Sequence, residues 1–490
     1  MHDLKIESPF LKLGSSFYTK LLPESVTNKP ELLHYNQRVA DQIGLNIPES
    51  KLQQADMLMQ LCGQKIQDGV EPYAMVYSGH QFGHWAGQLG DGRALMLGQC
   101  RSKDDALWDI QFKGSGRTPY SRFGDGRAVI RSSIREYLCS EAMYQLGIPT
   151  TQALCLIATQ EDVIREQIEP GAILTRISNS HIRFGHFEHF YHNDDEENLR
   201  KLADFVIDQH YPHFKDCASK YLDWFKTLCD QTAQLIAQWQ SVGFCHGVMN
   251  TDNMSAIGLT IDYGPFGFLE DYNPNHICNQ TDHSGRYAYA QQPHIGMWNL
   301  YALANCLRPM VPWNDLIAAI EKDYAAKISN YFAILMRGKI GCEREDSKAD
   351  NLWQSLLKIA SASKMDFTLI FRLLSPEVDL LHEEYDGIIS TEKARNALKD
   401  WQKNYHTHMQ SINRANADVK IGMNQVNPKY ILRNWLAEKA IRAAEDYNDY
   451  SVLESVFKVI SNPFEEHEIH SELSNPATEE QRGIALSCSS

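Results

Sequence analysis

Apolar and polar positions follow two different periods along the chain, and the change falls between residues 185 and 198. From about 76 to 185, short apolar runs separated by Gly-rich turns predict strands, for example at 95–97 and 108–113. From about residue 198 apolar positions recur every three or four residues, which predicts helices. The expected helical stretches are 230–240, 297–307, 313–335, 349–357 and 434–445. The pattern therefore predicts an α+β protein whose β-rich part precedes a larger helical part.

The same pattern predicts how the chain is divided. A long helix is expected over about 128–145, and a strand hairpin over 153–166. The N-terminal segment 1–75 is expected to form irregular stretches and short helices, and the acidic segment 461–490 a loosely held tail. The predicted divisions are 1–75, 76–185, 186–460 and 461–490.

Composition narrows the class of protein. Of 490 residues, 43% are apolar and 22% charged, as in ordinary globular proteins, and the net charge is -15. This charge argues against a general binder of nucleic acid or anionic membranes, and no apolar run is long enough to span a bilayer. The first residues lack the pattern of a signal peptide, and the eleven cysteines lack zinc spacing. A reduced, cytoplasmic compartment is therefore expected.

The strongest candidate for chemistry lies between residues 246 and 264. His246 and Asn253 keep the spacing of the kinase loop HRDxxxxN, and an Asp-Tyr-Gly triplet beginning at Asp262 takes the place of DFG. In kinases this Asn and Asp hold magnesium on the nucleotide, and such oxygen ligands suit Mg²⁺. The order and spacing favour a metal site at Asn253 and Asp262 over a polar loop between two buried strands.

One position departs from the kinase pattern. Two residues after His246 a kinase carries its catalytic Asp, whereas this chain carries Val248. An isopropyl group cannot accept a hydroxyl proton, so ordinary kinase chemistry lacks its base. Asp252, directly before Asn253, either takes that role with a differently placed nucleotide or only orients the loop.

Two copies of the tetrapeptide Gly-Asp-Gly-Arg, at 90–93 and 124–127, are candidates for phosphate binding. Glycine lets the backbone approach phosphate oxygens, and arginine adds a planar donor. The second copy precedes the 128–145 helix, whose N-terminus would favour an anion. A simple β-turn and a chance duplication are the alternatives. The candidate residues are Gly90, Gly92, Arg93, Asp125 and Gly126.

Three further basic residues are candidates for phosphate contacts. Lys113 ends the 108–113 strand and is expected to pair with Glu136 on the 128–145 helix, as the strand Lys and helix Glu of kinases do. The alternative is a Glu136 that faces solvent. Arg176 and Arg183 are seven residues apart, so a helical segment would put two unpaired guanidinium groups on one face. That arrangement suggests a bound polyanion, and surface salt bridges are the alternative.

Histidines gather at 181, 186, 189 and 192, interleaved with aromatic residues. Their spacing is not that of a zinc site, so aromatic packing is the favoured interpretation. His80 and His84 form an i, i+4 pair without an HExxH pattern. The sequence therefore predicts no metal site at these histidines.

Taken together, five motifs resemble the selenoprotein O family of pseudokinases. They are Tyr77-Ser78-Gly79-His80-Gln81-Phe82-Gly83, Gln88-Leu89-Gly90-Asp91-Gly92-Arg93-Ala94, Gln111-Phe112-Lys113-Gly114-Ser115-Gly116, His246-Gly247-Val248-Met249-Asn250-Thr251-Asp252-Asn253 and Asp262-Tyr263-Gly264. The resemblance covers most of the chain, from the N-terminal segment 1–75 to the terminal Cys488-Ser489-Ser490. It implies a protein-kinase-like two-lobed fold, with a β-rich N-lobe at 76–185, a helical C-lobe at 186–460, and N- and C-terminal extensions.

The resemblance also implies a reaction. The family transfers AMP, not phosphate, from ATP to Ser, Thr or Tyr hydroxyls of proteins, with its nucleotide reversed relative to a kinase. It implies ATP as co-substrate, Mg²⁺ or Mn²⁺ as cofactor, and proteins as substrates, with self-modification as one outcome. The net charge and hydropathy predict no nucleic-acid or membrane partner. UMP transfer from UTP, an ordinary protein kinase and a nucleotide-binding pseudoenzyme scaffold stay open as alternatives.

Roles follow position by position from the resemblance. Asn253 and Asp262 would hold the metal, Asp252 would be the base, and Glu136 would support Lys113. The implied nucleotide contacts are Gly90, Gly92, Arg93, Lys113, Asp125, Gly126, Arg176 and Arg183.

Two cysteines suggest redox regulation. Cys278 lies sixteen residues past Asp262, where a kinase has its activation loop. Family members carry cysteine or selenocysteine near the C-terminus, as Cys488 does here. The hypothesis is a reversible Cys278–Cys488 disulfide that restrains the loop, and two unrelated thiols are the alternative.

Overall fold

A large antiparallel sheet dominates the first part of the chain. The computed structural model describes residues 4–46, 48, 50–377, 379–380, 382, 392–412 and 414–486. The nine strands of the sheet in this part are β1 Ile6–Glu7, β2 Tyr18–Lys20, β3 Glu31–Tyr35, β4 Tyr73–Met75, β7 Ala94–Arg101, β8 Leu107–Lys113, β9 Ala128–Val129, β10 Gln152–Ile164 and β11 Ile168–Ser178. Their order is β2-β4-β7-β8-β11-β10-β3, with β1 beside β7 and β9 beside β11. The predicted α+β class is confirmed.

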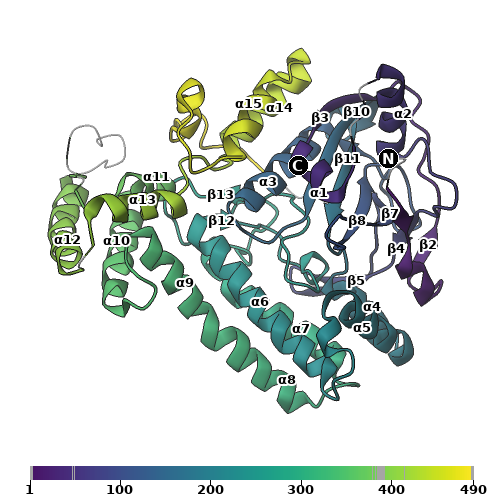
Figure 1. Cartoon of the computed structure of the whole chain (residues 1–490), viewed down its shortest axis with the longest axis horizontal. Coiled ribbons are helices and arrows are strands. Elements are labelled where there is room, and N and C mark those ends of the chain that lie inside the picture. Colours follow the sequence, from purple (N-terminus) through teal and green to yellow (C-terminus); the bar gives the residue numbers. More distant parts are fainter. Residues whose placement is uncertain are drawn as a thin grey trace.

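Helices make up most of the remaining described chain (Figure 1). They are α1 Gln37–Ile43, α2 Lys51–Leu61, α3 Ile130–Gln145, α4 Phe184–His192, α5 Glu196–His210, α6 Lys220–Val242, α7 Gln292–Leu307, α8 Trp313–Ala319, α9 Ala326–Lys339, α10 Asp350–Ser363, α11 Phe367–Leu373, α12 Glu392–Ser411, α13 Asn416–Val426, α14 Asn434–Tyr447 and α15 Ser451–Ile460. A π-helical segment, Ile320–Ala325, joins α8 to α9. The five helical stretches predicted from the sequence lie within or largely over these elements.

Side chains alternate across the sheet, and helices cover both faces. Phe112 and Ile173 belong to a core that α1 and α2 close on one face. Leu174 points to the other face, where α3 contributes Ile134 and Leu138. Because neighbouring residues of a strand face opposite sides, Lys113, next to Phe112, faces α3. Arg176, two residues after Leu174, faces the same side.

The helical part has two cores. The core under α3 continues into α4, α6, α7, α14 and α15, so the sheet and these helices pack as one body. A separate core joins α10, α12 and α13, which lie at the left of Figure 1. Helices α14 and α15 pack on α3 and hold it against the sheet.

A two-stranded ladder presents the 246–264 segment to the sheet. Strand β12 (Phe244–Cys245) pairs with β13 (Gly267–Phe268), and both strands are buried. The residues between them leave the ladder and return to it, with a short 3₁₀ turn at Thr251–Asn253. A second hairpin, β5 (Ser78–Gln81) with β6 (His84–Gln88), lies beside this turn and α4.

The expectations about the ends of the chain are only partly right. The N-terminal segment 1–75 contains the expected short helices, α1 and α2, but it also supplies strands β1 to β4. Strands β1 and β4 pair with β7, β3 pairs with β10, and β2 pairs with β4, so most of these strands gain their hydrogen bonds from segments far along the chain. The described part of the tail is not loose. Residues Glu468–Ser474 form a 3₁₀ helix, Leu473 and Leu486 are buried, and Arg482 pairs with Asp271 at 2.6 Å.

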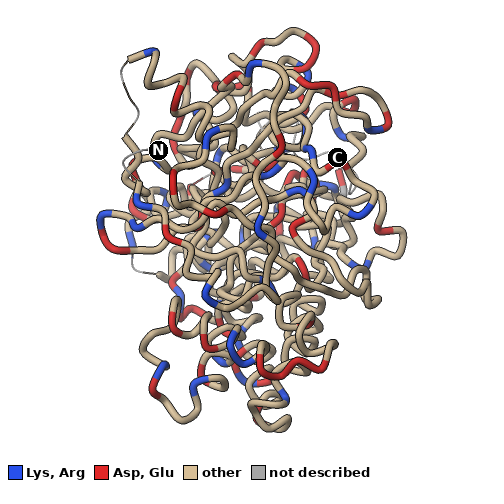
Figure 2. Tube along the Cα trace, turned by 90° about the vertical axis from the view of Figure 1, so that its right-hand side faces the viewer, with Lys and Arg blue, Asp and Glu red and all other residues tan. Residues whose placement is uncertain are grey.

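Acidic and basic residues are interspersed along the chain, as Figure 2 shows. Within the described ranges, no helix combines the length and the apolar character needed to cross a membrane.

Candidate active site

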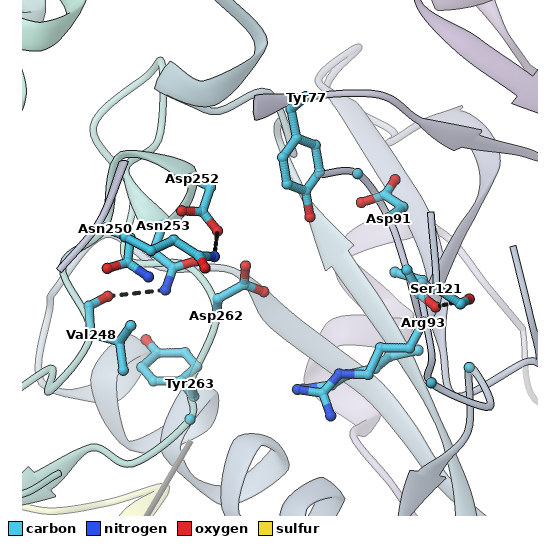
Figure 3. Close-up of a pocket in the computed structure, with 18 of the residues that line it drawn as sticks. Tyr77, Asp91, Arg93, Ser121, Val248, Asn250, Asp252, Asn253, Asp262 and Tyr263 are labelled. Atoms are coloured by element: carbon cyan, nitrogen blue, oxygen red, sulfur yellow. Dashed lines mark hydrogen bonds between the residues drawn. The ribbon is translucent and has the colours of Figure 1, made fainter. Parts of the chain in front are cut away.

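A cleft of about 670 Å³ opens between the sheet, the β5–β6 hairpin and the loop between β12 and β13 (Figure 3). It brings together residues that are widely separated in sequence. The residues singled out from the sequence that line it are Gly90, Gly92, Arg93, Lys113, Asp125, Gly126, Arg176, Arg183, Asp252, Asn253 and Asp262. Glu136 is buried behind Lys113 and Arg176.

Glu136 holds two cations on the α3 face of the sheet. Lys113 Nζ donates to Glu136 Oε2, and Arg176 Nε donates to Glu136 Oε1 at 2.6 Å. Lys113 follows Phe112, and Arg176 follows Leu174 by two, so strand alternation turns both toward α3. All three side chains are almost fully buried. The structure thus places together the strand lysine and helix glutamate that the sequence pairs.

Asp262 forms the second half of this charge network. Arg176 Nη2 lies 3.2 Å from Asp262 Oδ1, and Arg183 Nη1 donates to Asp262 Oδ2. The idea of two unpaired arginines on one helical face is wrong. Arg176 lies in strand β11, which continues to Ser178, and Arg183 caps the start of α4. The end of the strand and the start of the helix both face Asp262, so the guanidinium groups still converge.

Burial and pairing set the charges in this network. Burial alone would raise the pKa of Asp262, but Arg183 and Arg176 hold it well below its usual range. Burial lowers the pKa of Lys113 to about 8, although Glu136 acts in the opposite direction. Basic side chains outnumber acidic ones in the lining of the cleft, which includes Arg93, Lys113, Arg127, Arg165, Arg176 and Arg183 against Asp91, Asp125, Asp252 and Asp262. The cleft is therefore a basic site in an acidic chain.

The first Gly-rich turn approaches the cleft with its backbone. Gly90 has a φ of 144°, and a Cβ there would lie 2.4 Å from the ring of Tyr120. Arg93, three residues later, is exposed in the cleft, and within the described chain its guanidinium makes no ion pair (Figure 3). Arg93 is thus available to an anionic ligand.

The second Gly-rich turn, at 124–127, does not lie at a helix N-terminus as the sequence predicted. Asp125 accepts from Arg165 Nη1 at 2.7 Å and from the Arg127 backbone N–H at 2.9 Å, so it fixes the turn. Gly126, with a φ of 71°, allows the close approach of this turn to Gly116. Strand β9 separates the turn from α3, so the turn does not form the N-terminus of that helix. Arg165 also lines the cleft and was missed by the sequence reasoning.

Asp252 is a buried carboxylate with one uncommitted oxygen. Its residue is 7% exposed, and its Oδ2 accepts from Gln81 Nε2 at 3.2 Å. Its Oδ1 has no hydrogen-bond partner among the described residues. Burial raises the pKa of Asp252 to about 6, despite the opposing effect of Arg183. Because Asp252 lines the cleft, its carboxylate can accept a proton from a bound hydroxyl.

Asn253 and Asp262 offer oxygen ligands from the same loop. Asn253 Nδ2 donates to the Val248 backbone oxygen at 3.0 Å, which fixes the amide. Asp262 has a φ of 58°, a left-handed conformation that this non-glycine residue adopts at the cleft. An amide oxygen and a carboxylate beside a phosphate site suit Mg²⁺ or Mn²⁺. The residues present therefore fit a divalent cation of this kind.

The β5–β6 hairpin supports the loop from outside the predicted set. The Phe82 backbone N–H donates to Asn250 Oδ1 at 3.1 Å, and Tyr287 Oη donates to the same oxygen at 2.6 Å. The His80 backbone N–H donates to Thr251 Oγ1 at 2.7 Å. Sequence reasoning used the 77–83 run only as a family motif and gave it no structural role. Its role is to fix Asn250 and Thr251, the two residues that precede Asp252.

Cys278 lies under the loop. It is buried, and a Cβ on Gly247 would approach its Sγ to 2.7 Å. Burial raises the pKa of the Cys278 thiol well above its usual value. Cys488 lies outside the described residues. The Gln280 backbone N–H donates to the Leu486 oxygen at 2.8 Å, so the chain before Cys488 runs beside the 278–280 segment.

Comparison with known proteins gives a consistent result. The family model described as Protein adenylyltransferase SelO matches residues 1–461. A "Protein nucleotidyltransferase YdiU" of Burkholderia ambifaria is 45% identical over 498 residues, which cover 98% of this chain and 95% of the relative. Proteins of the same name from Burkholderia multivorans and Burkholderia cenocepacia are each 44% identical, over 98% and 99% of this chain and 95% of each relative.

The basic cleft and these relatives define the class, an enzyme that transfers nucleotidyl groups. More narrowly, the chain belongs to the SelO family, whose model covers nearly its whole length.

Proposed function

We propose that this enzyme transfers AMP from ATP to Ser, Thr or Tyr hydroxyls of proteins and releases pyrophosphate. The observation that supports this proposal most concerns two positions of the 246–264 loop, Val248 and Asp252. Val248 stands where a kinase has its base, and the buried Asp252 lines the same cleft. The description of the matching family also names adenylyl transfer to protein.

The basic network supports a nucleotide whose γ-phosphate points inward. Lys113, Arg176 and Arg183 would then hold the β- and γ-phosphates, and the polyphosphate would compete with Asp262 for the two arginines. Arg183 Nη1 also donates to the Asp252 backbone oxygen at 2.8 Å. The cations that stabilise the leaving group and the base are therefore neighbours, which suits attack at the α-phosphorus.

The reaction proposed for the chain's own residues has two parts. The target hydroxyl oxygen forms a bond to the α-phosphorus while its proton moves to the Asp252 carboxylate. The bond from the α-phosphorus to the bridging oxygen breaks, and the pyrophosphate leaves with the electron pair. Lys113, Arg176 and Arg183 stabilise the charge that develops there. Asn253 and Asp262 would hold Mg²⁺ or Mn²⁺, which when bound neutralises phosphate oxygens.

The proposal includes a kinase-like arrangement of two lobes. The 76–185 region with its Lys113–Glu136 pair would be the N-lobe, and 186–460 with the 246–264 loop the C-lobe. Of the two extensions, the described part of 1–75 adds strands to the sheet of the N-lobe, and the described part of 461–490 packs through Leu473 and Arg482. A reducing, cytoplasmic compartment is supported by the ten described cysteines, all of which are free thiols.

One alternative has a specific observation in its favour. The curated relatives are named nucleotidyltransferases without a stated nucleotide, so UMP transfer from UTP is the second candidate. A basic polyphosphate site of this kind serves either triphosphate.

Labelled nucleotides test the proposal. Purified enzyme with Mg²⁺ or Mn²⁺ is expected to label itself or an added protein from ATP carrying ³²P at the α-position. ATP labelled at the γ-position serves as the control and should give no protein label. Label from the γ-position alone would show a kinase, stronger label from α-labelled UTP would show UMP transfer, and ATP binding without any label would show a scaffold.

A redox switch is the second prediction, because Leu486 brings the tail to the Cys278 segment. With oxidised glutathione, the Cys278 and Cys488 thiols should form a disulfide while the glutathione is reduced to two thiols. Non-reducing peptide mapping should find the linked peptides. Cys488→Ser should abolish the link, and substitution of the exposed Cys217 by Ser should not. Two free thiols in the oxidised wild type would contradict the switch.

A further inference from the structure

Three potential metal ligands meet outside the cleft. His80 lies on the β5–β6 hairpin, and Glu188 and His192 lie one turn apart on α4. One ligand atom from each residue lies within 4.8 Å of the other two. None of the three lines the cleft of Figure 3.

We propose that His80, Glu188 and His192 bind a divalent first-row transition-metal ion of the Zn²⁺ type. Two imidazoles and one carboxylate are a donor set that such ions favour, with a fourth position for water. Mg²⁺ prefers oxygen ligands alone, so this site and the Asn253–Asp262 pair select different cations.

The present geometry needs only a small rearrangement to bind the ion. His80 Nδ1 lies 2.5 Å from Glu188 Oε1, which is closer than two ligands of one tetrahedral zinc, about 3.3 Å apart. The ion would separate this pair and draw His192 inward. His192 is exposed and can turn, because no part of the described structure hydrogen-bonds its ring.

The surroundings resemble the outer shell of a metal site. The ring of Trp85 lies tilted against those of His192 and His80, with centroids 3.9 and 5.1 Å away, and the ring of Trp298 lies 5.5 Å from that of His80. Glu188 is almost fully buried, and its second oxygen accepts from Thr251 Oγ1, which orients the carboxylate.

The link through Thr251 gives the site a consequence for the enzyme. Thr251 immediately precedes Asp252, and its hydroxyl oxygen also accepts from the His80 backbone. An ion at the cluster would therefore join the hairpin, α4 and the loop that carries Asp252. Sequence spacing did not reveal the cluster, because His80 comes from an element more than a hundred residues away from α4.

Cobalt spectroscopy tests the site without using activity. The metal-stripped full chain is titrated with Co²⁺ in excess Mg²⁺, and the visible absorption band of low-coordinate cobalt is recorded. One equivalent is expected to give the band, and Zn²⁺ should displace it. His192→Gln should weaken the affinity at least about tenfold. His84→Gln, which removes an exposed histidine from the same hairpin, should leave it unchanged.

Two further measurements separate this site from the active-site pair and from folding defects. Asp262→Asn should keep the cobalt band, and Zn²⁺ should raise the unfolding midpoint of the wild type but not of His192→Gln. The proposal is overturned by equal Co²⁺ affinity in wild type and His192→Gln, by loss of the band in Asp262→Asn, or by the absence of a band. In that case the His80–Glu188 contact is an ion pair only.

Discussion

Asp252→Ala is expected to lower nucleotidyl transfer by about 10²–10⁴-fold while ATP still binds. The loss follows because the Asp252 carboxylate, which lines the cleft, is proposed to receive the hydroxyl proton. The phosphate contacts come from other residues, so they remain. Initial rates with α-labelled ATP measure the first effect, and the ATP-induced shift of the unfolding midpoint measures the second.

Asp91→Asn is the matched control for this substitution. Asp91 is also buried in the cleft wall, and burial raises its pKa to about 6, as for Asp252. Its Oδ2 accepts from the Met75 backbone at 3.1 Å, a contact that the Asn oxygen can keep. Transfer should stay within a few-fold of wild type. Equal rates for Asp252→Ala and wild type would remove Asp252 from the reaction.

Glu136→Gln is expected to lower the free energy of unfolding by about 3–5 kcal/mol and to impair transfer. The carboxylate is buried between Lys113 and Arg176, and its charge offsets theirs. Burial would raise the pKa of Glu136, but Arg176 and Lys113 bring it below its usual value, so it is ionised near neutral pH. Without this charge two cations stay buried with less compensation.

Denaturant unfolding measures this loss, with Glu166→Gln as the control. Glu166 is exposed at the β10–β11 turn, so its substitution should change stability by less than about 0.5 kcal/mol. Added ATP should stabilise Glu136→Gln, because the phosphates supply negative charge to the same cations. A stability equal to that of the wild type would show that Glu136 does not hold the network together.

The pairing of Lys113 with Glu136 could be predicted because the two residues take the places of the strand Lys and helix Glu of kinases. Strand alternation then fixes the face of Lys113. The helical repeat alone puts Glu136 opposite Ile134 and Leu138, and it is buried because α3 is covered on nearly all sides. The 246–264 loop could also be predicted from the sequence, since His246, Asn253 and Asp262 keep the spacing of the kinase motifs. The local sequence therefore predicts those features of the site that depend on a single element or a single loop.

Features that depend on contacts between segments far apart in the sequence could not be predicted. The spacing of Arg176 and Arg183 suggested one helix. Arg176 instead lies in β11, which forms its hydrogen bonds with β8 and β10 on either side. The strands of the N-terminal segment 1–75 and the packing of the tail depend in the same way on contacts with distant segments. Gln81 supports Asp252 from 171 positions away, so no local pattern indicates it.

Intact-mass spectrometry of the modified protein tests the central claim most directly. After incubation with ATP and Mg²⁺ or Mn²⁺, the proposal predicts an added mass of about 329 Da for each AMP, which Asp252→Ala does not acquire. An added mass of about 80 Da from ATP would mean phosphoryl transfer and contradict the proposal.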